Sequence, residues 1–168
     1  EKKNLPIHGA MVNIVLRNGK ESNIIIVGDS GAGKSESLEA FRTLNENYIR
    51  HMRVIFDDMG YLQKEENGKI RAYGTEIGAF VRVDDLDPAY AFEQLDKGVY
   101  TNLDQVNARV TIPISTYAII SRGYPVDYFL YANHSNVAAK KILIYADLDI
   151  AIPLFEDGSR NAKGTTPE

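Results

Sequence analysis

Apolar residues alternate with polar or small residues over 7–17, and this alternation predicts a β-strand with one buried face. The four consecutive β-branched residues 24–27 are typical of a strand that is buried on both faces. Asn18-Gly19 lies between the two segments and is a strong signal for a tight hairpin turn. We therefore expect the strands to pair antiparallel, with the turn at one end and residues 7 and 27 near the other.

Beyond Val27 the apolar spacing becomes helical, with Leu38, Phe41, Leu44 and Tyr48 on one face, and it predicts a helix from Ser35 to about residue 47. The strand and the helix are joined by Gly-Asp-Ser-Gly-Ala-Gly-Lys-Ser at 28–35, which fits the P-loop pattern G-x-x-x-x-G-K-S. The glycines of such a loop let successive backbone N–H groups surround an anion, and the helix that follows adds the positive end of its dipole. A strand, a phosphate-binding loop and a helix are therefore predicted in succession.

The rest of the chain carries shorter apolar segments that are separated by turn-forming residues. Residues 147–153 are too apolar and too short to assign, and the tail from Glu156 to Glu168 has the composition of a loop. The elements expected in this part are a strand at 51–56, a hairpin over 61–74 with its turn at 65–69, an extended segment at 75–83, a short helix at 89–95, and strands at 109–114, 126–132 and 141–147.

These elements predict an α/β fold, with a mixed, twisted sheet that contains antiparallel hairpins and is covered by the P-loop helix. The 168 residues are enough for one domain with its own core, so residues 1–168 are expected to form a single nucleotide-binding domain. Because the chain begins at Glu1 and ends without a clear terminal element, we expect it to be a piece of a longer protein.

Composition narrows the possible partners. The net charge is −4 without a block of lysine or arginine, which argues against nucleic acid, so a small ligand is expected. There is no cysteine, which excludes disulfides, thiolate metal sites and a cysteine nucleophile. The absence of a signal peptide and of an apolar run near 18 residues predicts a cytoplasmic protein that is not bound to a membrane.

Two acidic residues, Asp57 and Asp58, follow the predicted strand 51–56. Acidic residues at the end of an apolar strand downstream of a P-loop commonly hold the catalytic metal, directly or through water. The pair could hold two metal ions, or one ion and one proton, whereas the alternative is a solvated turn. His8 lies at the end of the first strand that is remote from the turn, so hairpin pairing would bring it close to the P-loop. From this geometry alone, a structural and a functional role for His8 both stay open.

The ordered motifs resemble the nucleotide-binding core of bacterial HPr kinase/phosphorylase and of phosphoenolpyruvate carboxykinase. The resemblance begins with Ile7-His8-Gly9, the P-loop and Phe56-Asp57-Asp58. Three later segments, 76–82, 99–114 and 155–165, are similar to carboxykinase segments in the same order along the chain. The match covers nearly the whole chain and implies a fold like the C-terminal lobe of the carboxykinase.

The resemblance also implies roles for individual residues. His8 would lie beside the transferred phosphoryl group or bind the metal, and Mg²⁺ or Mn²⁺ would be held by Asp57 and Asp58 with the Ser35 hydroxyl. Arg109 would clamp the γ-phosphate, and Arg82 falls where the carboxykinase has a lysine that stabilises the charge of the transition state. The triphosphate of ATP, or of GTP, would lie on Gly28, Asp29, Ser30, Gly31, Ala32, Gly33, Lys34, Ser35 and Glu36.

The function expected from the sequence is therefore a metal-dependent phosphotransferase, with a small molecule or a protein as acceptor. If the acceptor is a hydroxyl group, Asp57 is the best candidate for the general base. Two departures from the family matter. At Arg82, a planar guanidinium group stands where the carboxykinase has the compact ammonium group of a lysine. The carboxykinase's N-terminal substrate lobe has no counterpart in the sequence. The alternatives are a nucleotide-binding regulatory module without turnover and a protein serine kinase like HPr kinase. The sequence does not decide the oligomeric state.

Overall fold

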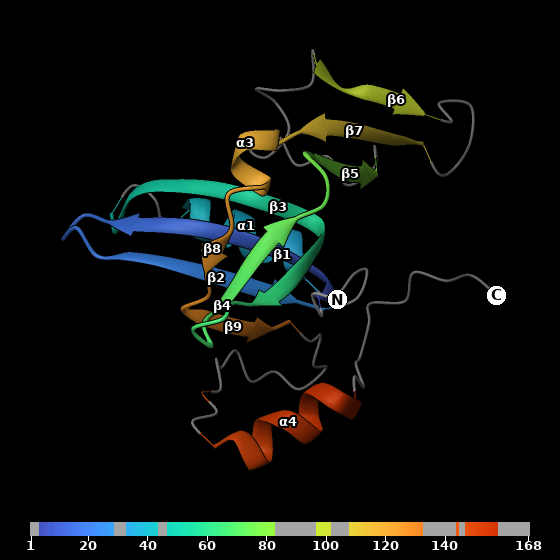
Figure 1. Cartoon of the computed structure of the whole chain (residues 1–168). Coiled ribbons are helices and arrows are strands. Elements are labelled where there is room, and N and C mark those ends of the chain that lie inside the picture. Colours follow the sequence, from blue (N-terminus) through green and yellow to red (C-terminus); the bar gives the residue numbers. More distant parts are fainter. Residues whose placement is uncertain are drawn as a thin grey trace, which may run out of the picture.

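A computed structural model describes residues 4–28, 33–43, 47–82, 97–101, 108–132, 144 and 147–157 of the chain. Strands dominate this part, as Figure 1 shows. The strands are β1 (Asn4–Leu16), β2 (Glu21–Val27), β3 (Ile49–Lys64), β4 (Ile70–Gly74), β5 (Gly78–Arg82), β6 (Val99–Thr101), β7 (Arg109–Pro113), β8 (Tyr124–Pro125) and β9 (Tyr128–Tyr131), and the helices are α1 (Lys34–Thr43), α3 (Tyr117–Ile120) and α4 (Leu148–Asp157).

The predicted N-terminal hairpin is confirmed. β1 and β2 pair antiparallel from Gly9 opposite Val27 to Val15 opposite Glu21. The turn is closed by the Gly19 amide, which donates to the Leu16 carbonyl at 2.9 Å, and Gly19 has a φ of +84°. A positive φ costs glycine little, which explains why the Asn-Gly pair makes this turn.

A second hairpin joins β3 to β4 through the predicted turn, in which the Glu65 amide donates to the Lys69 carbonyl at 2.8 Å. β3 also pairs antiparallel with β1 over almost the whole length of β1. β9 is the one strand of this sheet that runs parallel to its neighbour, β2, and Asp127 fixes its start by accepting from the Asn23 amide at 2.7 Å. The result is a curled six-stranded sheet in the order β8-β4-β3-β1-β2-β9 (Figure 1).

A smaller sheet of three antiparallel strands has the order β5-β7-β6. It is joined to the large sheet by the segment between β4 and β5, where the Ile77 carbonyl accepts from the amides of Ile114 and Ser115. β5 and β7 agree with the extended segment and the strand expected at 75–83 and 109–114, whereas β6 was not predicted.

The predicted α/β class is wrong, and so is the expected carboxykinase-lobe-like architecture: the described part of the chain is mostly β, with a half-barrel sheet and short helices. The physical reason is the connections. Tight hairpins join β1 to β2 and β3 to β4, so the long strands are antiparallel and need no crossover helix. α1 does follow β2, but the next strand, β3, pairs antiparallel with β1 instead of extending a parallel sheet.

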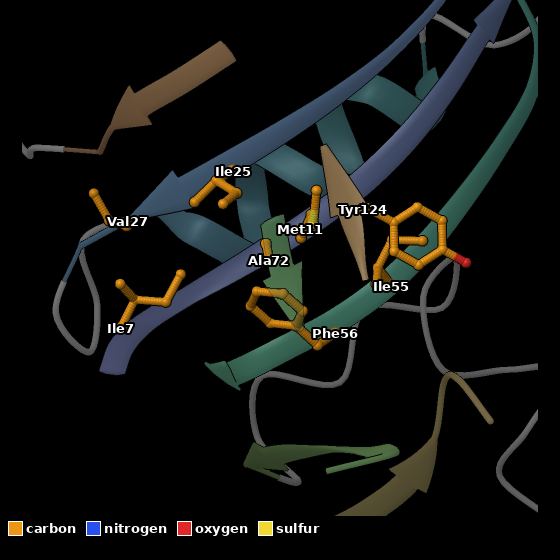
Figure 2. Close-up of a cluster of buried hydrophobic side chains, with 8 residues drawn as sticks. All are labelled: Ile7, Met11, Ile25, Val27, Ile55, Phe56, Ala72 and Tyr124. Carbon is orange, nitrogen blue, oxygen red and sulfur yellow. The ribbon is translucent and has the colours of Figure 1, made fainter. Parts of the chain in front are cut away.

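The large sheet buries apolar side chains on both faces. On one face, side chains of β1, β2, β3, β4 and β8 form a core that includes the fully buried Phe56 (Figure 2). On the other face, Leu38 of α1 packs against Val12 of β1 and Ile26 of β2. β1 therefore contributes to two cores, since its successive side chains point to opposite faces.

Helix predictions were partly correct. α1 confirms the helix after the P-loop, but its last described residue is Thr43 and not residue 47. α4 occupies 148–157, part of which was unassigned and part of which was expected to be loop. The expected helix at 89–95 lies outside the described residues, as does most of the expected strand at 141–147. No helix in the described part has the length and apolar character needed to cross a membrane.

Candidate functional site

Three segments that are distant in the sequence meet at one end of the large sheet. Gly9 of β1 lies opposite Val27 of β2 on one side and opposite Asp58 of β3 on the other. β2 ends at Val27, and α1 begins at Lys34. The start of the P-loop, the His8 strand and the two aspartates are therefore neighbours, because β1 is sandwiched between β2 and β3.

Lys34 contacts two of the segments that meet at this end of the sheet. Its Nζ donates to the carbonyl oxygen of Gly28 at 2.9 Å and lies 3.3 Å from Nε2 of His8. The prediction that hairpin pairing brings His8 close to the phosphate loop is confirmed by this contact. We call His8, Lys34, Asp57 and Asp58 the Lys34 cluster.

Lys34 and Asp57 are the only lysine, arginine or acidic side chains that are buried in the described part of the chain, with 8% and 6% of their surface exposed. Burying a charge is costly unless an opposite charge or a set of hydrogen bonds compensates for it. That both buried charges are residues predicted from the sequence is the strongest feature of the site. The alternative of a solvated turn at Asp57-Asp58 is wrong, since both residues lie within β3.

Asp58 has an unusual backbone. Its φ is 108°, and it is the only non-glycine residue with a positive φ among the described residues. Its carboxylate Oδ1 lies 2.8 Å from Nε2 of His8. Strained backbone conformations of this kind are concentrated at functional sites, where surrounding contacts hold them in place.

Glu76 was quoted in the carboxykinase-like segment 76–82 but was not identified as a site residue. The amide and hydroxyl of Thr75 both donate to the Met59 carbonyl, at 3.2 and 3.0 Å, which places Glu76 near Asp57 and Asp58. Burial raises the pKa of the Glu76 carboxyl, and the negative charges of Asp58 and Asp57 raise it further. The sequence did predict the hairpin over 61–74, which returns the chain to the two aspartates. That Glu76 comes close to them depends on the register between β3 and β4, which the sequence does not give.

Arg82 and Arg109 lie directly opposite each other, Arg82 on β5 and Arg109 on β7. The backbone register thus pairs these two predicted phosphate ligands in the small sheet, whereas the Lys34 cluster belongs to the large sheet and α1. The side chain of Arg82 lies outside the description.

The P-loop itself is described in part. Gly33 has a φ of +98°, a conformation that favours glycine, directly before the first residue of α1. Asp29, Ser30, Gly31 and Ala32 lie outside the described residues. Ser35 and Glu36 are in the first turn of α1, and their side chains also lie outside the description.

The donor atoms around Asp57 and Asp58 have the chemistry that Mg²⁺ prefers, because both side chains supply carboxylate oxygens. Within the described residues, no three His, Asp or Glu side chains are grouped so that they could hold a metal ion on their own. Protein sites for Mg²⁺ in nucleotide-dependent enzymes usually combine one or two carboxylates with water and the phosphates of the substrate. Asp57 and Asp58 are the residues that could hold such an ion.

Comparison with protein-family models and with curated proteins found no match.

Proposed function

We propose that this protein binds a nucleoside triphosphate, ATP or GTP, and transfers its γ-phosphoryl group to an acceptor in a reaction that depends on Mg²⁺ or Mn²⁺. The observation that carries the proposal is the buried charge of Lys34, the P-loop lysine that begins α1, at the same end of the sheet as buried Asp57. The resemblance of the ordered motifs to the carboxykinase and HPr kinase superfamily supports the same function.

Phosphoryl transfer demands mainly positioning and charge neutralisation from a protein. In the proposed reaction, Lys34 neutralises charge on the β- and γ-phosphates. Asp57 and Asp58 would hold the divalent metal ion, which would supply further positive charge to the site. Arg82 and Arg109, which are backbone neighbours in the small sheet, keep the phosphate-binding roles that the resemblance implies for them. His8 lies next to Lys34 and therefore beside the expected position of the γ-phosphate.

A calorimetric titration tests the binding step. The protein is titrated with ATP, and separately with GTP, in Mg²⁺, in Mn²⁺ and in EDTA. We expect tight binding that depends on the metal, and a loss of this dependence in Asp57→Asn. Asp149→Asn is a suitable control, because Asp149 is an exposed acidic residue in the first turn of α4. If binding is equal in metal and in EDTA for the unchanged protein, the proposed metal role is wrong.

Transfer is tested with ATP labelled at the γ-phosphate. Incubation with small hydroxyl and carboxyl compounds, and separately with a protein extract, shows whether the label reaches a small molecule or a protein. Label on a serine of a protein would indicate a kinase that resembles HPr kinase. Nucleotide binding without any transfer or hydrolysis would contradict the proposed enzyme and favour a regulatory nucleotide-binding module.

A further inference from the structure

Asp58 reaches His8 against the normal alternation of the sheet. Phe56 of β3 belongs to the core that Figure 2 shows, and Leu62 packs against the same core, so a regular strand would turn Asp58 to that face too. On β1, Ile7 faces the same core and Ala10 faces α1, which places His8 on the α1 face. The φ of 108° at Asp58 interrupts the regular strand, and its carboxylate comes within 2.8 Å of Nε2 of His8.

One nitrogen of His8 therefore has two charged neighbours. Nε2 lies 2.8 Å from Oδ1 of Asp58 and 3.3 Å from Nζ of Lys34. An ionised carboxylate can only accept a hydrogen bond, whereas an ammonium group can only donate one. If Nε2 carries a hydrogen, it donates to Asp58 and cannot accept from Lys34. If it carries none, it accepts from Lys34 and leaves the Asp58 carboxylate without this bond.

We propose that Asp58 is a positioning residue, which holds the hydrogen of His8 on Nε2 and so prevents His8 from taking a hydrogen bond from Lys34. Lys34 then donates to the Gly28 carbonyl rather than to His8, and in the proposed function its ammonium group binds the phosphates of the ligand. This inference rests on the proposed phosphate site. It assigns to Asp58 a role through His8 in addition to the metal ligation of the proposed function.

The sign of a binding change separates the two roles. Removing a negative charge beside a phosphate site should tighten anion binding if charge alone matters. If Asp58 positions His8, Asp58→Ala frees Nε2 to bind Lys34, and we expect binding of inorganic pyrophosphate in EDTA to weaken by about tenfold, as expected for competition from a charge-assisted hydrogen bond. Metal cannot contribute in EDTA, so metal ligation predicts tighter or unchanged binding there and a loss only in Mg²⁺.

Two variants complete the titration. Asp58→Asn keeps an acceptor oxygen for the Nε2 hydrogen and should retain most of the affinity for pyrophosphate. Glu76→Ala removes a nearby carboxylate that makes no described hydrogen bond to His8, and it should bind pyrophosphate as tightly as the unchanged protein or more tightly. Tighter or unchanged binding by Asp58→Ala, or weakening in all three variants, would overturn the positioning role.

A second measurement does not depend on any ligand. Nitrogen-15 NMR of the histidine side chains distinguishes the two ring tautomers, and the signal of His8 among the three histidines is assigned with His8→Gln. We expect the hydrogen on Nε2 in the unchanged protein and a shift towards Nδ1 in Asp58→Ala. A hydrogen on Nδ1 in the unchanged protein would overturn the proposal. If the unchanged protein does not bind pyrophosphate or ATP, the proposed function fails, and the tautomer still decides the role of Asp58.

Discussion

Gly9 lies directly against the backbone of Ile26, so that a Cβ atom at residue 9 would be 2.7 Å from the Ile26 carbonyl oxygen. The same atom would be 3.2 Å from Cγ1 of Val27. The 2.7 Å contact with the Ile26 carbonyl oxygen is sterically forbidden. This oxygen belongs to the backbone and cannot move without changing the sheet. A glycine is therefore required where β1 passes between β2 and β3, immediately after His8.

We predict that Gly9→Ala destabilises the protein by roughly 1–3 kcal/mol, the usual cost of forcing extra atoms into a packed region. Because Gly9 lies opposite both Val27 and Asp58, the substitution should also disturb the Lys34 cluster and weaken ATP binding. Urea denaturation and calorimetric titration measure the two effects. Gly19→Asn is the control, because Gly19 has open space around it and Asn tolerates its positive φ. Equal stability of Gly9→Ala and the unchanged protein would contradict the packing described for β1.

The backbone of Asp58 gives a separate prediction. Since glycine adopts positive φ without strain, Asp58→Gly should be more stable than Asp58→Ala by roughly 1 kcal/mol, although both lack the carboxylate. Both variants lack the contact with His8, so their difference in stability reports the backbone conformation at residue 58. The free energies of unfolding in urea give the result directly, and an alanine variant as stable as the glycine variant would show that residue 58 is not strained.

Glu76 should make stability depend on pH. Its pKa is raised above the ordinary value of 4.5, so the folded protein holds this proton more tightly than the unfolded chain does. Ionised Glu76 therefore destabilises the fold above its raised pKa, and the penalty disappears as the pH falls below 4.5. We expect Glu76→Gln to raise the melting temperature at pH 7 slightly. The matching gain in the free energy of unfolding should be below about 1 kcal/mol, because residue 76 is largely exposed.

The control for this pH series is Glu66→Gln, since Glu66 is exposed in the hairpin turn between β3 and β4. Thermal melts from pH 4 to pH 8, roughly the range in which carboxyl groups titrate, should show the gain of Glu76→Gln growing with pH and no such trend in the control. A gain that is largest at pH 4 would have the wrong sign and would show that folding does not raise the pKa of Glu76.

Local features of the fold could be predicted from the sequence because each depends on few residues. Asn18-Gly19 allows one tight turn, and the hairpin then determines that His8 and the P-loop share one end of the sheet. The hairpin alone therefore predicts that His8 lies close to the P-loop, where it contacts Lys34.

The sheet order could not be predicted in the same way. A P-loop between a buried strand and a helix is common in parallel α/β folds, and this association favoured the wrong class. What decides the class is the pairing of β3 with β1, between residues some 50 positions apart in the sequence, such as His8 and Asp58. The conformation of Asp58 and the position of Glu76 depend on this pairing, so they could not be predicted from the sequence either.

Substitution of the P-loop lysine tests the phosphate site most directly. Lys34→Met keeps an apolar side chain of similar length in a buried position but removes the charge. We predict that its dissociation constant for ATP with Mg²⁺ rises by about 100-fold or more, as loss of a charge-assisted contact to phosphate requires. Lys20→Met is the control, because Lys20 is exposed beside the first hairpin turn. This variant should bind ATP as tightly as the unchanged protein. With circular dichroism showing that both variants are folded, equal affinity of Lys34→Met and the unchanged protein would contradict a phosphate site at Lys34.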